Sequence, residues 1–355
     1  MLGSWSAFHD YDAIYQFSYD QSINEYVVGY FNMACNPIDF AMAPYITLAF
    51  RKNYVKKSKN YVRVKLTKGY IAEKMKDKNY NMNQFLENHF YAGWNAVYEV
   101  QILNDSKIVE PIIETNINTE EKGYFINDQI QWNNTNEGNN AYYYVKTEKY
   151  ITLTGFLGNS KMNKENKLGD LINIKVKLNE DYNETCTIGL VSLDDKILEN
   201  SEKLLLTVVG KVRNTDQQWN DNRNSTYDKG WGKAPTLVQF IEIEANLKFK
   251  EKSKPKVYSI NRYGELNEEF VLKGNSNNWI LNSDEENPTL NYYIIRNISQ
   301  EEKLDKDETF SNVIIFICII LLIIIIGIII LFLLKKKKKK ENVSNVEEGF
   351  FNDKL

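Results

Sequence analysis

Residues 186–210 read CTIGLVSLDDKILENSEKLLLTVVG and set the expected architecture. The two apolar runs, CTIGLVSL and LLLTVV, are separated by the turn signal Asp194-Asp195. Short β-rich runs divided by turn residues are typical of antiparallel strands. The same pattern of short β-rich runs and turn residues extends from Tyr124 to residue 298. It predicts a mainly β fold with a β-sandwich over 124–298. Further strands are expected at YFINDQIQW, YYYVK, YITLTGFLG, LINIKVKL, VQFIEIEANLKF, KVYSI, EFVLK and NYYIIR.

The N-terminal residues 1–60 have a β/α character. Residues 8–20, FHDYDAIYQFSYD, are apolar and aromatic on both faces, which indicates a strand covered on both sides. A helix should follow, because Asn36 is a suitable N-cap and Pro37 suits the first helical position, with a kink expected at Pro44. One strand and one helix cannot form a sheet, so we interpret residues 1–60 as the last β/α unit of a larger fold.

The connecting region 61–123 is mixed. The run VRVKL predicts a short strand, and a second strand is expected over residues 96–103. Between them, residues 68–90 are helical in pattern, with a break near Asn79 to Asn83. Residues 61–123 should therefore be a mixed α/β region that connects the N-terminal unit to the sandwich.

Residues 313–334, VIIFICIILLIIIIGIIILFLL, predict a transmembrane helix, since 22 uncharged residues span roughly 30 Å, the hydrocarbon thickness of a bilayer. A charged, polar stalk over 299–312 precedes this span, and Lys335 to Lys340 follow it directly. The positive-inside rule places the lysine-rich tail, residues 335–355, in the cytoplasm. The predicted localisation is a single-pass type I membrane protein with an extracellular ectodomain and the lipid bilayer as partner.

The first residues, MLGSWSAFHDYDAIYQF, lack the basic and apolar regions of a signal peptide. A type I protein requires such a signal, and without it the span would insert as a tail anchor with the lysines in the lumen. We therefore expect that the sequence lacks its native N-terminus.

Composition narrows the function classes. The net charge is −3, which gives no indication of nucleic acid as a partner. Aromatic residues reach 13%, including 23 tyrosines, which suits β structure and sugar stacking. No spacing of Cys or His predicts a metal site, and no nucleotide, hydrolase-triad or zincin motif occurs, so no cofactor is expected.

Cysteines and sequons bear on the compartment. Cys35 and Cys186 could form one bridge, but this is not a disulfide framework, and the sequence leaves their pairing open. Sequons, which are typical of a glycosylated ectodomain, occur at Asn104, Asn133, Asn183, Asn224 and Asn297, with one more at Asn342 in the tail.

Two blocks resemble a group of large retaining glycoside hydrolases built on a (β/α)8 barrel. DYDAIYQFSYD, continuing to NPIDFAMAPYITLAFRK, resembles the final barrel strand and helix, with Tyr11 in place of the usual Trp and Ala13 in place of Gly. The block from Ser192 to Leu247 resembles the β-sandwich after the barrel, with Gln239 in place of Glu. Its matching residues are Ser192, Leu193, Asp194, Ser201, Leu204 to Leu206, Gly210, Asn214, Thr215, Trp219, Asn220, Arg223, Ser225, Trp231, Gly232, Pro235 and Val238.

The resemblance implies a glycoside hydrolase-like protein without its catalytic pair. Retaining enzymes need two carboxylates about 5 Å apart, and the family's glutamates belong to barrel strands that precede this chain. We therefore expect the chain to be inactive alone; turnover of an aryl glycoside by residues 1–309 would contradict this. The acidic residues of the first block are Asp10, Asp12 and Asp20. They are interpreted as caps and a solvated loop charge rather than as catalysts.

Binding of polysaccharide is the remaining functional hypothesis. Tyr19 and Asp20 could line a sugar subsite; exposed Trp219 and Trp231 could stack on sugar rings, while Asn220, Arg223 and Asp228 bond hydroxyls. Alternatively, these residues brace a long loop against the sandwich. A second function class is also open, a non-catalytic cell-surface ectodomain that binds a glycan or a protein. Because most of the barrel is absent, residues 8–51 should leave apolar side chains such as Tyr15 and Phe40 exposed, and the sandwich should not depend on them.

Overall fold

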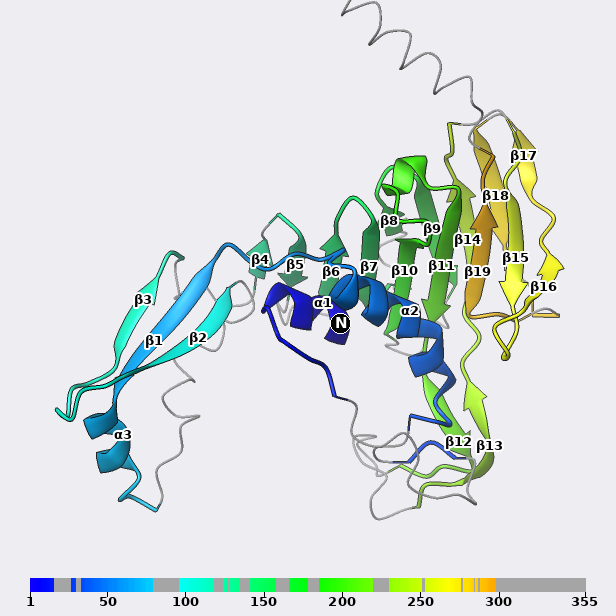
Figure 1. The fold of residues 1–355 in the computed structure, drawn as a ribbon. Helices are drawn as coiled ribbons and strands as arrows, with labels where there is room; N and C mark the ends of the chain where they lie inside the picture. Colours follow the sequence, from blue (N-terminus) through cyan, green and yellow to red (C-terminus); the bar gives the residue numbers. More distant parts are fainter. Residues whose placement is uncertain are drawn as a thin grey trace, which may run out of the picture. The chain divides into compact units, whose positions relative to one another are not determined.

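The structure, a computed structural model, is built on two β-sheets that face each other (Figure 1). The larger sheet has nine strands in the order β16-β15-β19-β11-β10-β7-β6-β5-β4. They are β4 (Tyr124–Ile126), β5 (Ile130–Asn133), β6 (Tyr142–Lys146), β7 (Tyr150–Gly155), β10 (Cys186–Ser192), β11 (Lys203–Val209), β15 (Lys256–Ile260), β16 (Leu266–Glu269) and β19 (Asn291–Ile295). The smaller sheet has the order β17-β18-β14-β9-β8. Its strands are β8 (Asn166–Leu168), β9 (Ile172–Lys177), β14 (Glu242–Leu247), β17 (Lys273–Asn275) and β18 (Asn278–Asn282).

The structure describes the chain in segments, and every statement below concerns these residues. They are 1–15, 27–29, 33–78, 96–117, 124–126, 128–133, 141–157, 166–177, 185–219, 230–250, 253–275, 277–283, 285–286 and 288–297. The predicted stalk, membrane span and tail, residues 299–355, lie outside them. No helix within the described segments is both long and apolar enough to cross a bilayer.

Strands β10 and β11 form the centre of the nine-stranded sheet, as the opening stretch predicted. They pair antiparallel, with Leu190 opposite Leu206 and Ser192 opposite Leu204. Successive side chains of a strand point to opposite faces, and in β11 every residue after Lys203 is buried. Both faces of this sheet are therefore covered at its centre, which explains the continuous apolar run LLLTVV.

One of these faces packs against the smaller sheet. Ile188 and Leu206 belong to a single apolar core that also contains Ile174 of β9, Ile243 of β14 and Leu281 of β18. Burying such side chains contributes on the order of 2 kcal/mol each. The predicted mainly β fold is confirmed, and two sheets sharing one core fit the predicted β-sandwich.

The opposite face is covered by helices α1 (Leu2–Phe8) and α2 (Pro37–Arg51). The predicted helix is confirmed: Asn36 caps α2 by accepting a hydrogen bond from the Ile38 amide at 3.1 Å, and α2 continues through Pro44. Tyr45 of α2 is only 1% exposed, and its hydroxyl donates to the Leu205 carbonyl at 2.8 Å. Residues 37–51 thus pack on the sandwich. The independence of the sandwich from residues 8–51 stays a prediction, which the core between the two sheets supports because it contains none of these residues.

The strand predicted over residues 8–20 is wrong for the described part. Phe8 ends α1, and residues 9–15 contain no strand; residues 16–20 lie outside the described residues. A strand needs neighbours to satisfy its backbone N–H and C=O groups, and this segment has none in the sheets described above. The exposed side chains expected here are present: Tyr15 is 91% and Phe40 43% exposed.

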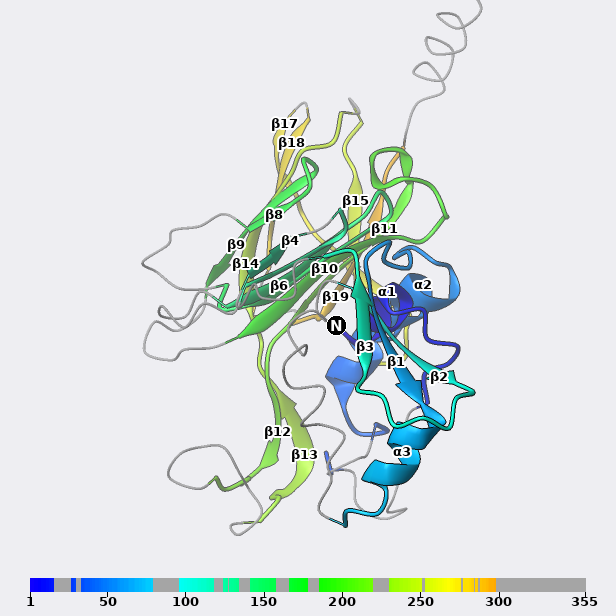
Figure 2. The same cartoon turned by 90° about the vertical axis from the view of Figure 1, so that its left-hand side faces the viewer.

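Residues 61–117 form a separate three-stranded sheet, seen together with α3 in Figure 2. The two predicted strands are confirmed as β1 (Tyr61–Thr67) and β2 (Val97–Leu103), which pair in parallel. The sheet also contains β3 (Ile112–Thr115), which the sequence analysis missed. The predicted helix begins at Lys68 but α3 ends at Lys74, while residues 79–95 lie outside the described segments.

Several predicted strands have different limits. YFINDQIQW is a hairpin, β4 and β5, rather than one strand. EFVLK is wrong, since its central residues 270–272 lie between β16 and β17. The break in VQFIEIEANLKF falls at residues 239–241, and its first part belongs to a separate two-stranded ribbon.

Candidate functional site

The predicted tryptophans lie beyond the ends of two paired strands, β12 (Val212–Thr215) and β13 (Lys233–Val238), which form a ribbon. Trp219 follows β12 and Trp231 precedes β13. In the chain, β12 follows β11 of the larger sheet and β13 precedes β14 of the smaller one, so the ribbon joins the two sheets (Figure 2). The strands pair antiparallel, with Arg213 opposite Leu237 and a register shift after Asn214.

Asn214 anchors this ribbon. The residue is buried, and its Nδ2 donates to the carbonyls of Val28 and Trp231, each at 2.8 Å. Its Oδ1 accepts from the Val28 amide at 2.8 Å. One amide side chain thus satisfies backbone groups from two distant segments, which fixes the position of the chain at Trp231.

Gly232 allows the two chain segments at the tip of the ribbon to approach each other closely. Its φ is +79°, and a Cβ atom there would lie 2.3 Å from the Thr215 carbonyl oxygen, so a side chain does not fit. Further along, the Gln218 amide donates to the Gly230 carbonyl at 3.3 Å. Trp219 directly follows Gln218, and Trp231 directly follows Gly230. Each tryptophan is therefore next to a residue of this backbone hydrogen bond.

Both tryptophan side chains reach solvent: Trp219 is 43% and Trp231 36% exposed. Asn214 supplies hydrogen bonds that hold this end of the ribbon, and the alternative that the tryptophans brace the loop stays open. An exposed indole ring offers a flat apolar face with a polar N–H at its edge, which is suited to stacking on a sugar ring or on a partner's apolar side chain. The candidate residues Asn220, Arg223, Asn224, Asp228, Tyr19 and Asp20 lie outside the described residues.

One ion pair lies beside the described end of the ribbon. Lys233 forms an ion pair with Asp216, with 2.7 Å between Nζ and Oδ2. The hydrogen bond from this side chain to Asp216 raises the pKa of Lys233 above its ordinary value. Both groups are largely exposed, so the pair contributes little stability.

A second group of polar residues surrounds a cavity of about 540 Å³ beside the end of α1. Its carboxylates are those of Asp10, Asp12 and Glu99, and two of them are already paired: Asp10 with Lys57 and Glu99 with Arg63, each at 2.8 Å. These are ordinary partly exposed ion pairs. Within the described segments, no three His, Cys, Asp or Glu residues come together as a possible metal site.

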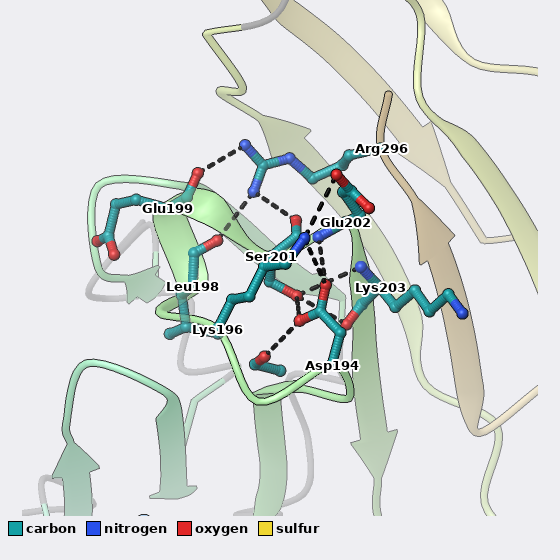
Figure 3. A network of polar contacts seen from close by, with 9 residues as sticks. Asp194, Lys196, Leu198, Glu199, Ser201, Glu202, Lys203 and Arg296 are labelled. Atoms are coloured by element: carbon teal, nitrogen blue, oxygen red, sulfur yellow. Dashed lines mark hydrogen bonds and ion pairs between the residues drawn. The ribbon is translucent and has the colours of Figure 1, made fainter. Parts of the chain in front are cut away.

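Asp194 and Ser201, two residues of the second resembling block, belong to a network of hydrogen bonds that Figure 3 shows. Asp194 Oδ1 accepts hydrogen bonds from the hydroxyls of Ser192 at 2.9 Å and Ser201 at 2.7 Å. Its Oδ2 accepts from the Glu202 amide at 2.8 Å. Burial alone would raise the pKa of Asp194, but these hydrogen bonds outweigh it and hold the pKa below its ordinary value. Asp194 thus closes the β10–β11 connection.

We expect Asp194→Asn to lower the free energy of unfolding by about 2 kcal/mol at neutral pH, because an amide replaces one charged acceptor oxygen with a donor. Since the folded-state pKa is depressed, this stabilisation is complete above about pH 4 and is lost as the pH falls through the folded-state pKa. The difference between wild type and variant should therefore shrink on acidification, measured by urea unfolding from pH 7 to pH 3. A difference in unfolding free energy that stays constant from pH 7 to pH 3 would contradict the idea that the ionised Asp194 carboxylate stabilises the fold. The control is Asp216→Asn, which alters an exposed carboxylate and should change little.

The sequons and cysteines are placed as follows. Asn104 and Asn297 are exposed and Asn133 is half-buried, whereas Asn183 and Asn224 lie outside the described residues. Cys186 is buried in the sandwich core and Cys35 precedes α2; neither forms a disulfide in the structure.

The sequence analysis did not predict that Asn214 anchors the ribbon. It identified Asn214, Trp231 and Gly232 only as residues that match the resembling family. Val28, the partner of Asn214, lies 186 residues away in the chain, and no local pattern indicates that contact. Comparison of the chain with protein-family models, curated proteins and solved structures finds no match. The resemblance to glycoside hydrolases accordingly stays a prediction.

Proposed function

We propose that this chain is a membrane-anchored portion of a glycoside hydrolase-like protein that binds polysaccharide without hydrolysing it. The observation that carries the proposal is the pair of exposed tryptophans at the tip of the ribbon. The hydrogen bond from Asn214 to the Trp231 carbonyl and the close approach at Gly232 fix the backbone next to Trp231 before any ligand binds. Such preorganisation lowers the entropic cost of association.

A polysaccharide suits this surface better than a small polar ligand. Two exposed aromatic rings can each stack on a sugar ring, and Lys233, the cation beside Trp231, is already paired with Asp216. The alternative, a protein partner, uses the same exposed tryptophans as anchors. The two alternatives are distinguished by whether the ribbon binds a polysaccharide or a protein.

We expect Trp219→Ala and Trp231→Ala each to weaken polysaccharide binding by about 1–2 kcal/mol, because exposed aromatic contacts contribute on that order. Affinity electrophoresis in gels containing soluble starch, xylan or mixed-linkage β-glucan measures the loss as restored mobility. The melting temperature should stay nearly constant, since both rings are already partly in water.

The matched control is Tyr15→Ala, which removes an exposed aromatic side chain outside the ribbon and should keep the wild-type retardation. If the tryptophan variants migrate like wild type in every gel, the ribbon does not bind these glycans. A collapse of the melting temperature would instead assign the tryptophans a structural role.

The proposed orientation places residues 1–309 outside the cell and the lysine-rich tail inside. The described sequons Asn104 and Asn297 are exposed and therefore accessible to modification. With a signal sequence fused ahead of Met1, we expect glycans on sequons of residues 1–309 and none on Asn342, measured by glycosidase-sensitive mass shifts of single-sequon variants. Modification of Asn342 alone would reverse the orientation.

A further inference from the structure

A cavity of about 820 Å³ lies away from the ribbon's tip, where the start of α2 meets one end of the nine-stranded sheet. Its lining comes from residues 34–41, from residues 238–240 at the end of β13, and from residues 260–264 and 288–291, which lie beside the paired ends of β15 and β19. This volume is in the range of small-molecule sites. Nothing in the sequence analysis indicated it, because its walls come from separate segments.

The walls are mainly apolar. Phe40, Val238, Phe240, Ile260 and Leu290 all line the cavity, and none of them is fully buried by the protein itself. Phe40 keeps 43% of its surface exposed. A hydrocarbon or aromatic group that entered the cavity would remove this apolar surface from water, which is favourable.

The side-chain amide oxygens of the lining and the Thr289 hydroxyl already form hydrogen bonds within the fold. A sugar needs several such groups to bond its hydroxyls, so this cavity is poorly suited to the polysaccharide proposed for the ribbon. The engaged atoms are Gln239 Oε1 (from Lys211 N, 3.1 Å), Asn261 Oδ1 (from Tyr263 N, 2.9 Å, and Glu265 N, 3.0 Å), Thr289 Oγ1 (to Asn291 O, 2.9 Å) and Asn291 Oδ1 (from Thr207 Oγ1).

One charged group lines the cavity. The Arg262 guanidinium carbon lies 4.7 Å from the ring centroid of Tyr263, and its Nη2 donates to the Tyr263 hydroxyl. Tyr263 is 70% exposed, so this pair belongs to the opening. Among the described residues Arg262 forms no ion pair, and the nearby Glu265 carboxylate accepts a hydrogen bond from Asn261 instead.

We propose that this cavity binds a small amphiphile with one carboxylate, such as a medium-chain acyl or aryl acid. The apolar walls take the hydrocarbon body, and the planar guanidinium of Arg262 can pair with the carboxylate through two N–H groups. A single guanidinium balances a single negative charge, so a monoanion fits better than a phosphate dianion. The site is distinct from the two tryptophans at the ribbon's tip and does not depend on the proposed glycan binding.

Calorimetric titration of octanoate into the full chain in phosphatidylcholine nanodiscs, with empty nanodiscs subtracted, tests the proposal. We expect one saturable site. Arg262→Gln should weaken octanoate binding about tenfold, and 1-octanol should bind about tenfold more weakly than octanoate. The matched control is Arg213→Gln, which removes an exposed arginine of β12 and should bind octanoate like wild type.

Cys35 supplies an independent readout because it lines the same cavity. Saturating octanoate should slow its alkylation by N-ethylmaleimide, measured by peptide mass spectrometry, in wild type but not in Arg262→Gln at the same octanoate concentration. Cys186, buried in the sandwich core, is the internal control for unfolding. The proposal is overturned if octanoate gives no heat above the blank, if octanol binds as tightly, if Arg262→Gln binds like wild type, or if maltose occupies the site instead.

Discussion

Replacing Arg296 by methionine should lower the free energy of unfolding by about 3 kcal/mol. Arg296 is only 4% exposed and donates to three carbonyl oxygens: those of Leu198 at 2.8 Å, Glu199 at 2.9 Å and Ser201 at 3.1 Å (Figure 3). Methionine fills a similar volume but donates nothing, so these carbonyls lose their partner inside the fold. The guanidinium also lies 4.5 Å from the ring centroid of Phe249, and this cation–π contact would be lost as well.

Chemical denaturation of the wild type and of Arg296→Met, followed by tryptophan fluorescence, measures this difference. Arg296→Lys should fall between them, because an ammonium keeps the charge but cannot reach three carbonyls in the planar geometry of a guanidinium. The control is Arg213→Met, since Arg213 is exposed and its replacement should leave stability nearly unchanged. Equal stability of Arg296→Met and Arg213→Met would show that the network around the β10–β11 connection contributes little.

The sequence predicted the centre of the fold well because local chemistry and tertiary packing agree there. The runs around β10 and β11 are β-branched, apolar and closed by a turn, and they are buried on both faces. Helix α2 was predicted from its N-cap and from Pro37. The segment around Tyr15 was not, because apolar and aromatic residues indicate burial without showing whether a partner strand exists to complete the hydrogen bonds.

The candidate site was predicted only in part. Trp219 and Trp231 were identified as residue types that can stack, and the structure shows that both reach solvent. The support beneath them depends on Asn214 and Val28, which come together only through the tertiary fold. The same limit explains why the cavity at Arg262 was missed: its walls come from segments that no sequence spacing connects.

The contact between α2 and the sheet leads to the second large expected effect. Tyr45→Ala should lower the free energy of unfolding by about 3–5 kcal/mol, since a fully buried aromatic ring is lost and the sheet face beneath it is exposed. Tyr45→Phe should cost only about 1 kcal/mol, the usual value of one hydrogen bond, here the bond to the Leu205 carbonyl. Both values come from denaturant unfolding. A small effect of Tyr45→Ala would support the sequence-based expectation that the sandwich is independent of residues 8–51.

Gly189 of β10 makes this contact possible and provides a sharper test. A Cβ atom at Gly189 would lie 2.4 Å from Tyr45 Cε1, so the ring occupies the space that a side chain would need. Gly189→Ala alone should therefore destabilise the protein by about 1–3 kcal/mol through overpacking. In the Tyr45→Ala background the ring is absent, and the same substitution should cost much less. A double-mutant cycle would then give a coupling energy of at least about 1 kcal/mol. Additive effects would mean that α2 does not lie over β10 at this residue.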